Sequence, residues 1–135
     1  MNLVKSILLS ASGMHAQGER MKVIAENLAN ANSTAQTPGG DPYRRKVLTF
    51  KNTLDRTLGL ERLEVGKVAT DKSDFQLRYD PGHPAADANG YVKLPNVNSL
   101  IEMSDLREAQ RSYEANLSAI DAAKSMLSRT VDLLR

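Results

Sequence analysis

Both ends of this chain carry apolar residues that recur every seven positions, and this spacing constrains the fold more than any other feature. The N-terminal repeat consists of Ile7, Met14, Met21 and Leu28. The C-terminal repeat consists of Leu106, Tyr113, Ile120, Leu127 and Leu134, joined by Leu117 and Val131. A seven-residue repeat keeps one face of a helix turned toward a partner over many turns. We therefore expect a long helix at each end, the two paired antiparallel as a coiled coil.

The middle of the chain has the patterns of strands and turns. Residues 32–42 are rich in Gly, Pro, Asn, Ser and Thr, which is typical of a loop. Strand-like stretches follow at residues 43–50, 63–68, 75–79 and 91–94, and residues 51–60 have the pattern of a helical or irregular piece. Phe75, Leu77 and Tyr79 alternate with polar residues, so this strand is expected to be half-buried.

These patterns predict an α+β fold in three parts. Residues 1–33 form the N-terminal helix, residues 34–96 form a loop and a small β-rich middle region, and residues 97–135 form the C-terminal helix. Asn98 or Ser99 is placed to cap the second helix, and Glu102 lies in its first turn, where a carboxylate favours the helix dipole.

Composition excludes several classes of function. The 135 residues include two Phe, four Tyr and no Trp, so the core is thin, and a net charge of +2 gives no strong field for nucleic acid or acidic lipid. The basic cluster 43–46 is more typical of a strand surface than of a nucleic-acid platform. Cysteine is absent, which excludes disulfides and thiolate metal sites. No apolar run reaches the ~20 residues of a membrane span. The apolar stretch near the N-terminus leads directly into the helical repeat, so we expect no cleaved signal peptide.

The one candidate catalytic or metal site lies at Asp80, His83 and Asp87. Two carboxylates and an imidazole are able to hold a metal or to act as acid and base, as in a small metal-dependent hydrolase. Two prolines and a glycine between Asp80 and Ala85 are equally typical of a tight turn. The hydrolase therefore stands as an alternative function.

Amide side chains near the two repeats point instead to assembly. Asn27, Asn30 and Asn32 lie at the end of the first helix, where they can satisfy open carbonyls and bond neighbouring chains, and Asn116 lies beside the second repeat. Buried amides weaken a helix pair but favour one register. Together with the repeat residues, these four asparagines make up the predicted assembly interface. Two alternatives remain open: the asparagines are solvent-facing caps, or the chain is a soluble coiled-coil adaptor that binds one partner helix.

Several stretches resemble the flagellar axial family of rod and hook proteins. The resemblance rests on residues 12–17 and 25–32 near the N-terminus, on residues 79–92 and 94–98 in the middle, and on residues 102–103, 111–116 and 123–124 near the C-terminus. The middle string is typical of the proximal-rod members. Residues 36–41 lengthen the turn that follows the Asn-rich segment in this family.

This resemblance implies a structural subunit of the basal-body rod with no catalytic residue, metal or cofactor. It implies export through the flagellar type III apparatus without signal cleavage, and a place in the rod within the periplasm. The implied partners are other copies of the chain, proximal and distal rod proteins, and the adaptor between the rod and the export gate. We expect the paired helices to form the inner layer of a helical tube, and the middle region to make contacts outside it.

Overall fold

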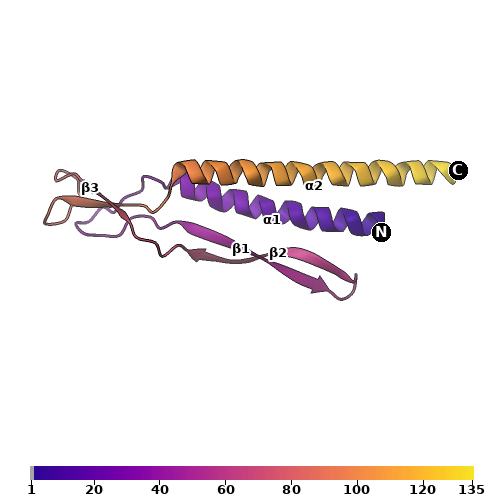
Figure 1. The fold of residues 1–135 in the computed structure, drawn as a ribbon, viewed down its shortest axis with the longest axis horizontal. Coiled ribbons are helices and arrows are strands. Elements are labelled where there is room, and N and C mark those ends of the chain that lie inside the picture. The colour runs from indigo at the N-terminus through magenta and orange to yellow at the C-terminus, as the bar shows by residue number, and fades with distance from the viewer. Residues whose placement is uncertain (1) are drawn as a thin grey trace. The chain divides into compact units, whose positions relative to one another are not determined.

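The structure is a computed structural model that describes residues 2–135, and it has an α+β fold (Figure 1). Its elements are α1 (Leu3–Ala29), β1 (Lys46–Asp55), β2 (Leu60–Thr70), β3 (Gln76–Tyr79), β4 (Tyr91–Leu94) and α2 (Ser99–Leu133). Two long helices pack together, and two small two-stranded sheets lie between them in the sequence. The predicted α+β fold with a long helix near each end is confirmed, while the antiparallel coiled coil stays a prediction. Among residues 2–135 no helix is both long and apolar enough to cross a membrane.

The chain is divided into two compact units, and each helix contributes to both. Unit 1 consists of Met1–Lys22, Leu48–Lys67 and Arg107–Arg135, and unit 2 consists of Val23–Val47 and Val68–Leu106. The buried apolar residues of unit 1 are small, namely Ala16, Ala109 and Ala123. Those of unit 2 are Val23, Ile24, Ala85 and Val92. Both cores are thin, as the low aromatic content predicts.

The helices begin at asparagine caps. The side-chain oxygen of Asn98 accepts hydrogen bonds from the backbone N–H groups of Leu100 and Ile101, at 3.1 and 3.4 Å. These donors have no partner inside the helix, so the cap stabilises the first turn of α2. Of the two caps predicted for this helix, the structure has Asn98.

Strands β1 and β2 form a hairpin, and here one expectation is wrong. Residues 51–60 are neither helical nor irregular, because β1 continues to Asp55 and β2 begins at Leu60. The Asp55 side chain accepts hydrogen bonds from the backbone N–H groups of Thr57 and Leu58, and its carbonyl accepts one from Gly59, whose φ is 63°. A connection this short joins only antiparallel strands. Pairing between strands, which local sequence does not reveal, decides the structure of this segment.

Strands β3 and β4 pair antiparallel, with Tyr79 opposite Tyr91 and Arg78 opposite Val92. The prediction of a half-buried β3 is wrong, because Leu77 and Tyr79 are 63% and 65% exposed. Side chains at alternate positions share a face. Val92 lies on the buried face of this sheet, and the opposite face, which carries Leu77 and Tyr79, is exposed.

Gly66 lets the two strands of the hairpin approach closely in unit 1. A Cβ atom at this position would lie 2.7 Å from the Thr49 hydroxyl and 2.8 Å from the Thr49 carbonyl oxygen. A backbone carbonyl has little freedom to withdraw, so only glycine fits without displacing β1. Strand β2 runs uninterrupted through this residue.

We predict that Gly66→Ala lowers the free energy of unfolding by about 1–3 kcal/mol, because the added methyl group forces the strands apart. Gly18→Ala is the matched control: it lies within α1 and its added Cβ would have no neighbour within 4 Å. This control should stabilise the chain by about 0.5–1 kcal/mol, through helix propensity. Urea unfolding followed by circular dichroism measures both. Equal effects of the two substitutions would contradict the close approach at Gly66.

Candidate assembly surface

Asn27 belongs to a polar network in unit 2 and is only 1% exposed. Its amide nitrogen donates to the Lys46 carbonyl at 2.9 Å and to a carboxylate oxygen of Glu102 at 3.2 Å. Its amide oxygen accepts from the Tyr43 hydroxyl at 2.8 Å and from the Lys46 backbone N–H at 2.9 Å. Burial raises the pKa of Tyr43. One side chain of α1 therefore joins the start of β1 and the first turn of α2.

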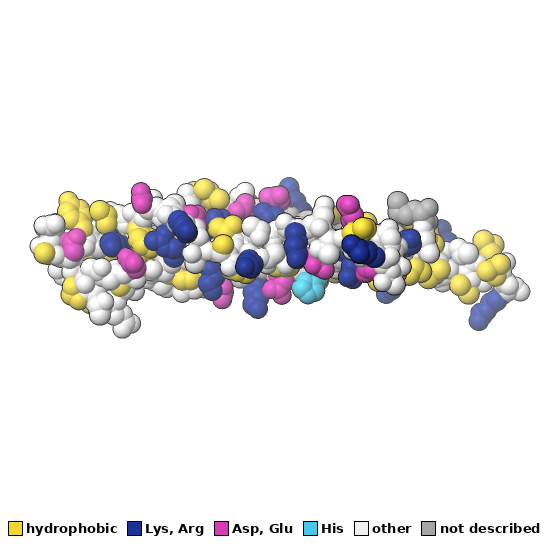
Figure 2. All heavy atoms as spheres, turned by 90° about the horizontal axis from the view of Figure 1, so that it is seen from below, with side chains coloured by type: hydrophobic (Ala, Val, Ile, Leu, Met, Phe, Trp, Pro, Cys, Tyr) yellow, Lys and Arg dark blue, Asp and Glu magenta, His cyan; other side chains and the backbone are white. Residues whose placement is uncertain are grey.

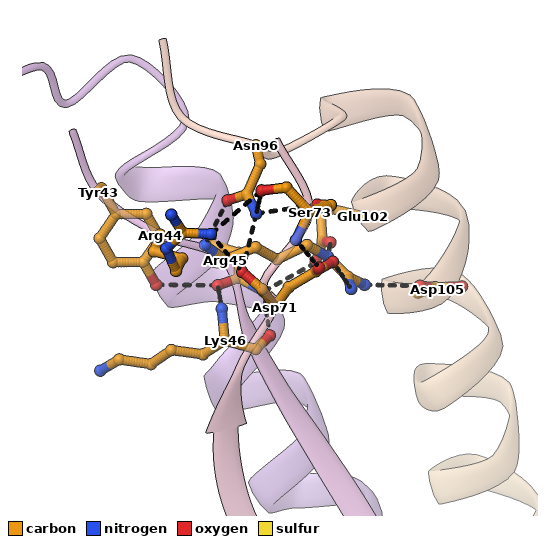
Figure 3. A network of polar contacts seen from close by, with 10 residues as sticks. Tyr43, Arg44, Arg45, Lys46, Asp71, Ser73, Asn96, Glu102 and Asp105 are labelled. Atoms are coloured by element: carbon orange, nitrogen blue, oxygen red, sulfur yellow. Dashed lines mark hydrogen bonds and ion pairs between the residues drawn. The ribbon is translucent and has the colours of Figure 1, made fainter. Parts of the chain in front are cut away.

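Glu102 is fully buried and forms an ion pair with Arg45. The Nε–H group of Arg45 donates to one carboxylate oxygen, and the other oxygen accepts from Asn27 (Figure 3). The Arg45 guanidinium also lies 3.5 Å from the Asp71 carboxylate and 4.0 Å from that of Asp105. Burial lowers the pKa of Arg45, but the hydrogen bond that Arg45 donates to Glu102 and the charges of the nearby carboxylates outweigh it, so the net pKa is raised. The fully buried charge of Glu102 is tolerated because both of its carboxylate oxygens have hydrogen-bond partners.

Asp71, Arg44 and Asn96 complete this network. The Asp71 carboxylate accepts the backbone N–H of Ser73 at 2.9 Å, and this bond, ahead of the charge of Arg45, lowers the pKa of Asp71. Arg44 lies 4.2 Å above the ring centre of Phe75 and donates to the Asp71 carbonyl at 2.9 Å. Asn96 accepts from the Arg45 backbone N–H at 2.8 Å. The side chains of the basic cluster 43–46 are thus engaged in hydrogen bonds and ion pairs inside unit 2. Sequence reasoning missed this network, because its bonded members are up to 75 positions apart.

The residues of the hydrolase alternative serve the turn between β3 and β4. His83 Nδ1 accepts the backbone N–H of Ala85 at 3.0 Å, and Nε2 lies 3.3 Å from the Thr34 hydroxyl. The Asp87 carboxylate accepts the backbone N–H groups of Asn89 and Tyr91, and Asp80 pairs with Arg78. Within residues 2–135 there is no group of three or more side chains that could hold a metal ion. The turn interpretation accounts for each of these side chains.

The three predicted asparagines at the end of α1 have different surroundings. Asn27 has partners in its own chain for both amide atoms, as described above. The Asn30 amide donates to the Glu26 carbonyl at 2.9 Å, which satisfies an open helix end, and its oxygen accepts from the Ser33 hydroxyl. Asn32 is exposed. A role in contacts between chains stays a prediction for all three, and Asn32 has the most accessible side chain.

In unit 1 the helices approach closely where Asn116 of α2 lies against Gly13 of α1. A Cβ atom on Gly13 would be 2.9 Å from the Asn116 amide nitrogen, which donates to the Ser112 carbonyl. The buried Ala16 and Ala109 belong to the same pair of helices. Small residues bring the helices together, so little apolar surface is buried between them.

The predicted interface residues fall into two groups by exposure. Ile7, Met14, Met21, Leu28, Leu106, Tyr113, Asn116 and Ile120 are half-buried. Leu117, Leu127, Val131 and Leu134 are exposed, by 43%, 39%, 51% and 83%. Figure 2 shows apolar side chains gathered at the C-terminal end of α2. Further exposed apolar residues that the repeat did not reveal are Val4, Leu8 and Leu9 on α1 and Leu100, Ile101 and Met103 on α2. In the sequence these residues are marked only as apolar positions in or near the two helical repeats.

Two long helices that leave apolar residues exposed to solvent are typical of a protein that assembles with other chains. Residues 7–35 match the family described as "Flagella basal body rod protein", and residues 88–133 match "Flagellar basal body rod FlgEFG protein C-terminal".

Curated relatives cover nearly the whole chain. The "Flagellar basal-body rod protein FlgC" of Agrobacterium fabrum is 53% identical over 127 residues, which are 94% of this chain and 91% of the relative. The protein of the same name in Bacillus subtilis is 40% identical over 98% of this chain and 99% of the relative. The one from Salmonella typhimurium is 39% identical over 98% of both chains. The chain belongs to the FlgC family of flagellar basal-body rod proteins, and the resemblance noted from its motifs is confirmed.

The buried ion pair predicts a specific pattern of stability. Glu102→Gln should lower the free energy of unfolding by about 3 kcal/mol, because it leaves the Arg45 guanidinium without its main charge partner. Arg45→Met should cost about 3–5 kcal/mol, since it leaves a fully buried carboxylate unpaired. The double substitution should cost clearly less than the sum of the two. Glu114→Gln, on the exposed side of α2, is the control and should change stability by less than about 0.5 kcal/mol. Additive losses in chemical denaturation would show that the two charges are not coupled.

The lowered pKa of Asp71 predicts how stability depends on acid. A carboxyl group whose folded-state pKa lies below its unfolded value of 3.8 contributes stability above that value and loses it as the pH falls through the folded pKa. Asp71→Asn should therefore flatten the acid side of the stability profile. Denaturation midpoints measured between about pH 5 and pH 2 test this. A profile identical to that of the wild type would mean that Asp71 is not held in its charged form.

Proposed function

We propose that this protein is a structural subunit of the bacterial flagellar basal-body rod and not an enzyme. The observation that carries this proposal is the 53% identity over 94% of the chain with the FlgC of Agrobacterium fabrum. The exposed apolar residues at the C-terminal end of α2 support it, because such a surface is stable in water only when other chains cover it. The turn-holding roles of His83 and Asp87 leave the hydrolase alternative without an observation in its favour.

The long helices form an antiparallel coiled coil in this proposal. Two contacts inside unit 1 support the antiparallel direction of the helices. Gly13 lies against Asn116, and Arg20 pairs with Glu108 at 3.5 Å. A residue with a higher number on α1 therefore meets a residue with a lower number on α2. Residues 1–33 and 97–135 would form the inner layer of a tube, and residues 34–96 would make lateral and axial contacts outside it. This division keeps the proposed three-part organisation of the chain.

Open-ended assembly follows from the kind of surface that is left exposed. A contact between two different patches of one protein generates a helical filament or tube when the rotation between copies does not close into a ring, and we propose the open form here, as one section of the flagellar drive shaft. The proposed interface consists of the repeat residues together with Asn27, Asn30, Asn32 and Asn116. Asn27 also makes four hydrogen bonds in its own chain, so it helps to hold unit 2 in shape as well.

The proposed partners are other copies of the chain, other proximal and distal rod proteins, and the adaptor between rod and export gate. The family resemblance supports a place in the proximal rod within the periplasm, reached through the type III export apparatus. Export without a cleaved signal belongs to the same proposal and is supported by the family resemblance alone.

The direct test is purification of hook–basal bodies from cells that produce a tagged copy of this chain. We expect the tagged protein to remain with the basal bodies through detergent and density-gradient steps. An untagged deletion strain complemented by the same gene should recover swimming motility. A discrete, soluble complex with one partner, and no protein in basal bodies, would favour the coiled-coil adaptor and contradict the proposal.

Charge placed on the exposed stripe should block assembly. We predict that Leu117→Asp abolishes swimming while the protein remains expressed, since the side chain is 43% exposed and its loss barely affects the fold. Met21→Asp, at a half-buried position, should also abolish motility but with some loss of stability. Ser118→Asp adds the same charge at the neighbouring exposed position and is the matched control. Normal swimming of the Leu117 variant in soft agar would count against the interface.

A further inference from the structure

The apolar stripe of α2 extends past the end of its partner helix in unit 1. Asn116 lies against Gly13, so eleven residues further along, Leu127 reaches the level of Asn2, just before α1 begins at Leu3. Figure 1 shows the C-terminal end of α2 continuing beyond the start of α1. The exposure of the stripe rises at this point, from half-buried at Ile120 to 51% at Val131 and 83% at Leu134. The helix pair therefore ends before the stripe does.

A second apolar feature of unit 1 is a groove of about 480 Å³ between α1 and β2. Its apolar lining comes from Leu8 and Ala11 of α1 and from Leu63 and Val65 of β2. Leu8 is 37% exposed at the edge of the groove. Ser12 and His15 of α1 and Arg62 and Glu64 of β2 complete the lining. A groove that combines apolar and polar side chains suits an amphipathic helix, whose apolar face it can receive.

The stripe and the groove of one chain have no means of meeting each other. Successive helical residues are turned by about 100°, which places Leu8 and Ser12 roughly 100–140° around α1 from the Gly13 face that α2 contacts. The end of α2 also lies beyond Leu3, on the far side from the groove, which begins one turn further into α1. A straight helix reaches neither the right face nor the right level. The two apolar surfaces are therefore complementary only between different copies.

We propose that the C-terminal residues 127–134 of one copy dock into the groove between α1 and β2 of a second copy. The contact joins two different patches, so it is head-to-tail and continues from copy to copy. This contact continues the helix pair of a single chain. The stripe of α2 packs on α1 of its own chain, and its C-terminal part would pack on the second copy. The proposal rests on the proposed rod function and names the contact by which copies of this chain join.

The absence of cysteine from the chain gives a clean test. Flagellated cells would produce two copies, one carrying Leu8→Cys and the other Val131→Cys, with different tags. Purified hook–basal bodies would be oxidised and the products separated without reductant. We expect a disulfide-linked dimer that carries both tags. The matched control replaces Val131→Cys by Arg129→Cys, which lies on the opposite face of the same part of α2. The Val131 pair should give about tenfold more dimer, because a disulfide forms only when the two Cα atoms are within ~7 Å.

Each outcome has a defined meaning. Dimer at the level of the Arg129 control, in basal bodies that contain both copies, would overturn the docking contact and leave the rod function standing. Absence of the wild-type chain from basal bodies would overturn both. If the cysteine variants fail to enter rods although the wild type does, a charge exchange decides. Leu8→Lys and Val131→Glu should each reduce motility, and together they should restore it. Failure of the pair to restore motility would overturn the contact.

Discussion

The fully buried carboxylate of Glu102 is the interaction on which unit 2 depends. It binds Arg45 at the start of the first hairpin strand and Asn27 near the end of α1, while itself belonging to the first turn of α2. Removing Arg45 would leave the buried carboxylate without its counter-ion, and removing Asn27 would leave one of its oxygens without a hydrogen bond. Three segments distant in sequence are therefore held at one point. The thin apolar core around Val92 and Ile24 requires such a polar centre.

Unit 1 is held together differently. Gly13, Ala16 and Ala109 bring the helices close, but small side chains bury little apolar area, so the stabilisation from this contact is modest. The larger apolar side chains of α2, such as Val131 and Leu134, face solvent. A chain with this distribution gains stability by association with other chains. The proposed assembly and the proposed docking of residues 127–134 both rest on this imbalance.

Sequence reasoning predicted the parts of the fold that local periodicity controls. The seven-residue repeats predicted both long helices, and Asn98 was among the predicted caps. It failed for residues 51–60, whose strand and turn depend on pairing with β2, and for Leu77 and Tyr79, whose exposure depends on which elements cover the sheet. Glu102 was assigned to the helix dipole, whereas its burial depends on Arg45, 57 positions away. The repeat located the stripe of α2, but only the structure shows where α1 stops covering it.

The central claim is that the exposed stripe of α2 becomes buried when the chain joins others. The most direct measurement is maleimide labelling of a cysteine at position 131, in the free protein and in purified hook–basal bodies, with a cysteine at position 129 measured in parallel. The account predicts fast labelling of both positions in the free protein and strong protection of position 131 alone in the rod. Equal labelling of position 131 in the two states would contradict it.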